Sequence, residues 1–109
     1  MSISTHVLDS TTGTPASGVA TRLELASAAG WQHVADAVTD TDGRVGRLAE
    51  TAESGTYRLT FDVGSYFDAR GIATFYPEVT ISFRVDDPGS HYHVPLLLSP
   101  FAYSTYRGS

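Results

Sequence analysis

Hydrophobic and polar residues alternate with a period of two along three segments of this chain. Apolar side chains occupy every second position from Tyr57 to Val63, and the segments 19–25 and 79–85 show a similar alternation. Successive side chains of a β-strand point to opposite faces of the sheet. Each segment is therefore predicted to be a strand with one buried and one polar face.

Weaker strand patterns, separated by turn residues, extend this prediction. They lie at 3–9, 31–39, 44–48, 91–98 and 101–107. Between two of them stands Asp42-Gly43, a dipeptide typical of tight hairpin turns because glycine, and often aspartate, tolerates a positive φ. The chain is thus expected to contain about eight short strands.

One segment between two strands lacks the alternation. Residues 65–70 show no period of two and end at Gly71, which predicts a short helix of one or two turns. Together, these elements predict an all-β fold: a two-layer antiparallel β-sandwich of about eight strands with one short helix. With 109 residues, the chain is expected to form a single domain spanning 1–109.

The amino-acid composition indicates which binding partners and which kinds of site are not expected. The net charge is −5, and the seven basic residues form no run, so a nucleic-acid partner is not expected. The absence of cysteine excludes disulfides and thiolate metal sites. No apolar stretch approaches the ~18 residues of a membrane span, and the first residues lack the features of a signal peptide. We expect a soluble cytoplasmic protein without a membrane partner.

Histidines are the first candidates for chemistry, because their ordinary pKa lies near neutrality. His6 lies on the face of its predicted strand opposite Val7, which suits either a half-exposed strand histidine or a general base. His91 and His93 share one strand face, as a zinc-binding pair would, but no sequence signature supplies a third ligand. Ordinary strand or interface histidines remain the alternative.

Two further features are suited to binding polar groups. Arg44 directly follows the Asp42-Gly43 turn and is either a surface arginine or a clamp for an oxyanion. The final residues, Tyr106 to Ser109, place a phenol, a guanidinium and a carboxylate within four positions, where they could hydrogen-bond a polar heterocycle. No phosphate loop or dinucleotide fingerprint occurs, so the residues favour proton transfer and oxyanion stabilisation without a cofactor.

Five short motifs, in order along the chain, closely resemble the transthyretin-like 5-hydroxyisourate hydrolase family. They are His6-Val7-Leu8-Asp9, Thr41-Asp42-Gly43-Arg44, Phe75-Tyr76-Pro77-Glu78-Val79, the segment His91-Tyr92-His93-Val94-Pro95-Leu96-Leu97-Leu98-Ser99-Pro100 and the terminal Tyr106-Arg107-Gly108-Ser109. The resemblance covers the chain from His6 to Ser109.

The resemblance implies a transthyretin-like sandwich that assembles as a homotetramer, a dimer of dimers, with active sites in the channel where the dimers meet. It implies hydrolysis of 5-hydroxyisourate to 2-oxo-4-hydroxy-4-carboxy-5-ureidoimidazoline in urate degradation, without a metal or cofactor. The implied catalytic residues are His6, Arg44 and His93, and the implied substrate-binding residues are Tyr106, Arg107, Gly108 and Ser109.

Three questions stay open at the level of sequence. Either His6 or His93 could be the general base that activates water. The same fold could serve a transthyretin-type carrier of small aromatic ligands, because a fold alone does not fix a function. A purely structural or adhesive sandwich domain is the third possibility, and it predicts no cluster of polar residues in a buried channel.

Overall fold

A computed structural model describes residues 2–49 and 53–109 of the chain. Its strands and single helix follow one another in the order β1 (Ser2–Asp9), β2 (Thr14–Pro15), β3 (Ala20–Ser27), β4 (Gly30–Val38), β5 (Arg44–Ala49), β6 (Gly55–Phe61), α1 (Val63–Asp68), β7 (Val79–Val85), β8 (His91–Leu98) and β9 (Tyr103–Thr105). In the described ranges, no helix is long and apolar enough to cross a membrane.

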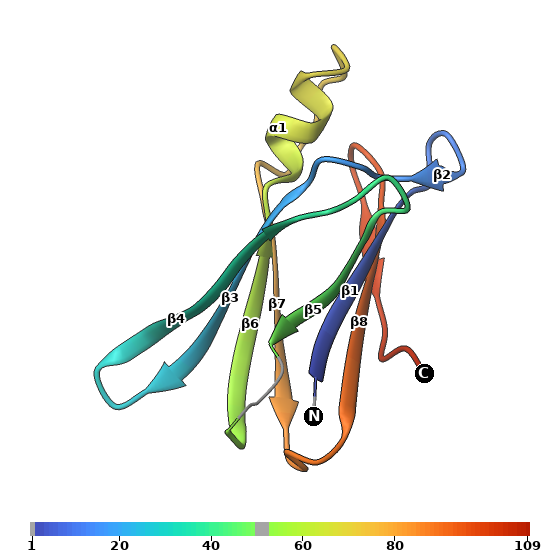
Figure 1. Cartoon of the computed structure of the whole chain (residues 1–109). Helices are drawn as coiled ribbons and strands as arrows, with labels where there is room; N and C mark the ends of the chain where they lie inside the picture. Colours follow the sequence, from blue (N-terminus) through green and yellow to red (C-terminus); the bar gives the residue numbers. More distant parts are fainter. Residues whose placement is uncertain (1, 50–52) are drawn as a thin grey trace.

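The strands form two sheets that pack as two layers (Figure 1). One sheet has the order β2-β1-β8-β9, and β5 pairs with β1 as well; the other has the order β4-β3-β6-β7. This arrangement confirms the predicted all-β sandwich with one short helix. Alternate side chains of both sheets fill the space between the layers, among them the fully buried Leu23, Leu59 and Leu96.

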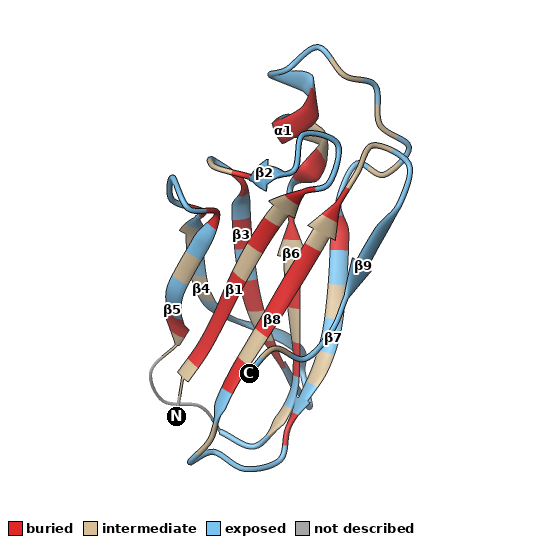
Figure 2. Cartoon of the chain, turned by 90° about the vertical axis from the view of Figure 1, so that its right-hand side faces the viewer, coloured by how far each residue is buried: buried red, intermediate tan, exposed pale blue. Residues whose placement is uncertain are grey.

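One pairing departs from the antiparallel prediction and positions the site. Strands β1 and β8 run parallel, in register from Ser2 opposite His91 to Asp9 opposite Leu98. Figure 2 shows the two strands side by side, between β5 and β9. Side chains of β1 and β8 alternate between the buried core and the outward face of this sheet, so the two ends of the chain present their outward residues together.

The helix begins two residues earlier than predicted. The strand expected to reach Val63 ends at Phe61, because the Asp62 side chain caps the helix by accepting a hydrogen bond from the Ser65 backbone N–H at 3.2 Å. The predicted stop is present: Gly71 lies just beyond the helix with φ of +67°.

A buried hydrogen bond ties this helix to β1. The Tyr66 hydroxyl donates to Asp9 Oδ2 at 2.9 Å, and the Thr11 backbone N–H donates to Asp9 Oδ1 at 2.9 Å. Both Tyr66 and Asp9 are buried. Because a buried carboxylate is costly without partners, these contacts couple the helix to the strand that carries His6.

Two smaller differences concern strand lengths. The strand predicted at 101–107 is confined to Tyr103–Thr105, and the residues after it meet the sheet again through an isolated bridge between Gly108 and His93. A short strand, Thr14–Pro15, lies where the sequence predicted only a turn, and it pairs with the end of β1.

Candidate functional site

His6 and Arg44 are direct cross-strand neighbours on the outward face of the first sheet. The register of β1 and β5 places their Cα atoms opposite one another. A tight turn fixes this register, because Asp40 Oδ1 accepts from the Arg44 backbone N–H at 3.0 Å. Gly43 has φ of +75° and sits so close to the Val7 carbonyl oxygen that an added Cβ would clash with it. The turn thus requires glycine directly before Arg44.

The same turn orients the His6 ring. His6 Nε2 lies 2.9 Å from the Asp42 carbonyl oxygen. A carbonyl only accepts hydrogen bonds, so Nε2 carries the hydrogen and donates it. In the neutral ring, the lone pair that could take a proton is then at Nδ1.

His93 lies on the same outward face, one strand away. Its Nδ1 is 2.7 Å from Ser4 Oγ, and Ser4 is its register partner on β1. Burial lowers the pKa of His93 below its ordinary value of 6.5, and the neighbouring positive charge of Arg44 lowers it further. A histidine in this environment is neutral at physiological pH, as a general base must be.

The C-terminal residues reach back to His93. The Gly108 backbone N–H donates to the His93 carbonyl oxygen at 2.8 Å. A Cβ at Gly108 would clash with His93 Cδ2 and would lie 3.1 Å from Cγ of the same ring. Glycine at this position is therefore what allows the tail to lie against the imidazole. Arg107 stacks on the Tyr92 ring at 4.6 Å from its centroid, and Tyr106 is largely exposed.

A cavity of about 340 Å³ brings some of the predicted residues together. His93, Tyr106 and Arg107 are part of its wall. The rest of the wall comes from β7, β8 and β9, namely Ile81, Ser82, Phe83, Arg84, Tyr92, Val94 and Thr105. His6 and Arg44 do not line this cavity. They stand beside His93 across the outward face of the sheet, and the single chain does not gather all the predicted residues around one hollow.

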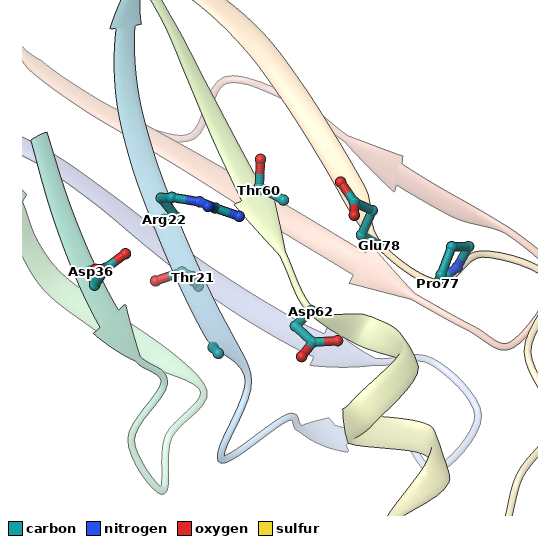
Figure 3. A pocket seen from close by; sticks show the side chains of 8 residues that line it. Thr21, Arg22, Asp36, Thr60, Asp62, Pro77 and Glu78 are labelled. Carbon is teal, nitrogen blue, oxygen red and sulfur yellow. The ribbon is translucent and has the colours of Figure 1, made fainter. Parts of the chain in front are cut away.

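A second cavity, of about 470 Å³, lies on the other sheet. Figure 3 shows Arg22, Asp36 and Thr60 on three neighbouring strands at this cavity, with Asp62 and Glu78 close by. Asp62 is the helix cap described above, and none of the predicted site residues lines this cavity. It lacks the histidines that proton transfer near neutrality requires, so the first sheet carries the candidate site.

Sequence reasoning missed Ser4 as part of this site. Ser4 is buried, and its hydroxyl lies within hydrogen-bond distance of both His93 and His91. The available signal was the strand period, because Ser2, Ser4 and His6 share one face of β1. This pattern identifies Ser4 as a site residue only once β8 is known to pair with β1.

A zinc site at His91 and His93 would need a third ligand from elsewhere in the described part of the chain. Among residues 2–49 and 53–109, no group of three or more histidine, aspartate or glutamate side chains is placed to hold a metal ion. The Ser2 hydroxyl contacts His91, and the Ser4 hydroxyl lies within hydrogen-bond distance of nitrogen atoms of both rings.

Comparison with known proteins identifies the family. A model of the HIUase/Transthyretin family matches residues 3–108. The chain belongs to the HIUase/Transthyretin family. Among its relatives in this family is the 5-hydroxyisourate hydrolase of Salmonella dublin, which is 45% identical over 98% of this chain and 80% of its own length. The predicted resemblance is thus confirmed, and the chain is a hydrolase.

Solved structures similar to this chain include a 5-hydroxyisourate hydrolase and a transthyretin. The Klebsiella pneumoniae 5-hydroxyisourate hydrolase superposes with a TM-score of 0.89 at 35% identity, covering 100% of both chains. Sea bream transthyretin in complex with thyroxine superposes with a TM-score of 0.94 at 32% identity, covering 99% of this chain and 95% of that chain. The fold alone therefore does not separate the hydrolase from the transthyretin.

Proposed function

We propose that this family member hydrolyses 5-hydroxyisourate to 2-oxo-4-hydroxy-4-carboxy-5-ureidoimidazoline, a ring-opening step in urate degradation. One observation carries the proposal: His6, Arg44 and His93 lie together on the outward face of three adjacent strands. Two imidazoles and a guanidinium are the groups needed to deprotonate water and to stabilise the oxyanion that forms at a carbonyl. The substrate class follows from the enzyme relatives.

In the proposed mechanism, water attacks the ring amide carbonyl of the substrate while a histidine removes its proton. His93 is suited to this role by its lowered pKa, and His6 by the free lone pair that its bond to Asp42 leaves at Nδ1. Both histidines remain candidates for the base. Arg44 stabilises the developing oxyanion; loss of such a donor costs about 3 kcal/mol of transition-state stabilisation. No metal or organic cofactor takes part in this scheme.

The terminal tetrapeptide is proposed to hold the substrate. Tyr106 and Arg107 line the cavity next to His93, and Gly108 lies against the His93 ring. The phenol of Tyr106 and the guanidinium of Arg107 supply hydrogen-bond donors and an acceptor for the amide groups of an oxidised purine. Holding the reacting carbonyl close to the base contributes to rate by orientation.

We also propose that the chain, as a single domain, assembles in the cytoplasm as a homotetramer, a dimer of dimers. Large apolar side chains are exposed in the isolated chain: Phe75, Phe101, Tyr103 and Tyr106. The edge strands β7 and β9 border the cavity, so a second copy could close the hollow that a single chain leaves open. Light scattering tests this proposal, and a monomer would remove the proposed interface site.

The decisive experiment is a direct assay. 5-Hydroxyisourate is generated from urate with urate oxidase, and its ultraviolet decay is followed after addition of the purified protein. We expect acceleration by the wild type and its loss in His6→Ala and Arg44→Ala. His33→Ala and Arg22→Ala are matched controls, because they remove the same side chains from exposed positions on the other sheet and should keep full activity.

A carrier of small aromatic ligands is the alternative, favoured by the close superposition on the transthyretin–thyroxine complex. A folded, tetrameric sample that leaves the decay of 5-hydroxyisourate unchanged would support the carrier. Thyroxine binding measured by calorimetry would then be the next test.

A further inference from the structure

Four side chains form a continuous hydrogen-bonded chain across β1 and β8. Starting at the site, His93 Nδ1 lies 2.7 Å from Ser4 Oγ, and Ser4 Oγ lies 3.1 Å from His91 Nε2. His91 Nδ1 is in turn in contact with the Ser2 hydroxyl. The two imidazole rings stack with centroids 6.3 Å apart and an angle of 16° between their planes. A single hydroxyl thus bridges two histidines.

The chain of hydrogen bonds passes from a half-buried side chain through a buried one to an exposed one. Ser4 is only 6% exposed and His93 is half-buried, whereas His91 is exposed. The parallel register fixes the order, because it sets Ser4 opposite His93 and Ser2 opposite His91. The chain therefore leads from a half-buried catalytic candidate to a histidine in contact with solvent. Burial disfavours retention of a proton on His93, and the neighbouring Arg44, His91 and His6 disfavour it further.

The proposed reaction creates a need for such a path. Hydrolysis of the ring amide gives a carboxylic acid, which ionises at neutral pH, and a ureido nitrogen, which is not basic. One proton must therefore leave the site in each turnover. His93, with a pKa lowered by burial, is suited to receive this proton but not to keep it.

We infer that Ser4 and His91 conduct the proton from His93 to solvent. This inference rests on the proposed hydrolase function and assigns two residues to it. When His93 Nε2 takes up a proton, His93 Nδ1–H releases its own to Ser4 Oγ. The Ser4 hydroxyl passes its proton to His91 Nε2, and the exposed His91 ring delivers a proton to water. Each side chain ends neutral, and one proton has moved from site to solvent.

Two variants cut this path at different points. Ser4→Ala removes the bridging hydroxyl, and His91→Gln keeps a group that can hydrogen-bond Ser4 but cannot be protonated. In dilute buffer both should lower kcat by up to about 10²-fold, the lower end of the effect of a proton-transfer group. KM should stay near the wild-type value, because neither residue is placed in contact with substrate. Thr80→Ala and His33→Gln, on exposed positions of the other sheet, serve as matched controls.

Chemical rescue separates conduction from structure. His91→Ala leaves space at an exposed position, so added imidazole should restore its kcat in a concentration-dependent manner. A ring that only supported the strand would gain nothing from imidazole. A readout without substrate is nitrogen-15 NMR of the imidazoles, in which Ser4→Ala should shift the His93 Nδ1 resonance as its hydrogen bond to the hydroxyl is lost.

The outcomes distinguish this inference from the proposed function. An inactive wild type would overturn the hydrolase proposal and the conduction with it. An active wild type together with a His91→Gln variant that keeps wild-type kcat in dilute buffer would overturn only the conduction. Loss of kcat in both variants, with imidazole rescue of His91→Ala, supports it. Because His91 is exposed, its variants give an answer even where Ser4→Ala fails to fold.

Discussion

Replacing Gly108 with alanine probes how closely the C-terminal tail must approach His93. The added methyl would clash with Cδ2 of the ring, and it would lie 3.1 Å from Cγ and 3.2 Å from Pro95 Cγ. Carbon atoms make good contact at about 3.5–4.0 Å, so the ring or the tail must move by about 1 Å. A displacement of this size at a reacting group can lower the rate by about 10²-fold.

The assay is steady-state hydrolysis of 5-hydroxyisourate, with thermal unfolding measured on the same sample. We expect kcat/KM to fall by about 10²-fold while the melting temperature changes little, because the tail is exposed and contributes little to the core. Gly46→Ala is the matched control: it adds the same methyl to β5 of the same sheet, where no described atom beyond the two adjacent residues lies within 4 Å. Wild-type kcat/KM in Gly108→Ala would show that the contact between tail and ring does not matter, and would refute the reasoning.

Three further predictions concern the site and its support. If His93 is the base, kcat/KM should decline only below pH 6.5, because the lowered pKa keeps the His93 ring neutral down to more acidic pH. A midpoint at or above 6.5 in the pH–rate profile would contradict this prediction. Arg44→Lys should lower kcat/KM by about 10²-fold or more, since an ammonium cannot reproduce the guanidinium fork, and an unchanged value would exclude Arg44 from oxyanion binding. Tyr66→Phe should lower the free energy of unfolding by about 1–3 kcal/mol in urea titrations, because it leaves the buried Asp9 Oδ2 without the hydrogen bond from the Tyr66 hydroxyl. A loss of unfolding free energy near zero would mean that water replaces the hydroxyl.

Local sequence patterns predicted the strands well because burial on one face leaves a direct trace in the sequence. The segments 79–85 and 91–98 match β7 and β8 residue for residue. The helix start was misjudged, because Val63 continues the apolar alternation of β6 although the cap at Asp62 has already ended the strand. In that case side-chain capping overrode the hydrophobic pattern.

The arrangement of the site could be predicted only in part. The resemblance supplied His6, Arg44 and His93, but their adjacency depends on which strands pair. The parallel pairing of β1 with β8 joins segments more than eighty residues apart, and nothing in either segment specifies its neighbour. For the same reason, the sequence alone did not distinguish Ser4 from the other hydroxyl residues; the pairing of β1 with β8 does.

The parallel pairing of β1 and β8 also sets the order in which the protein can be completed during synthesis. Strand β1 leaves the ribosome first, yet its partner β8 ends only at Leu98. At about 5–20 residues per second, one edge of β1 remains unpaired for several seconds after β5 has emerged. During that interval β1 has an open edge, which invites pairing with other chains. Truncation before β8 should therefore yield an aggregating chain and not a smaller folded one, and activity would arise only when the two ends of the chain meet.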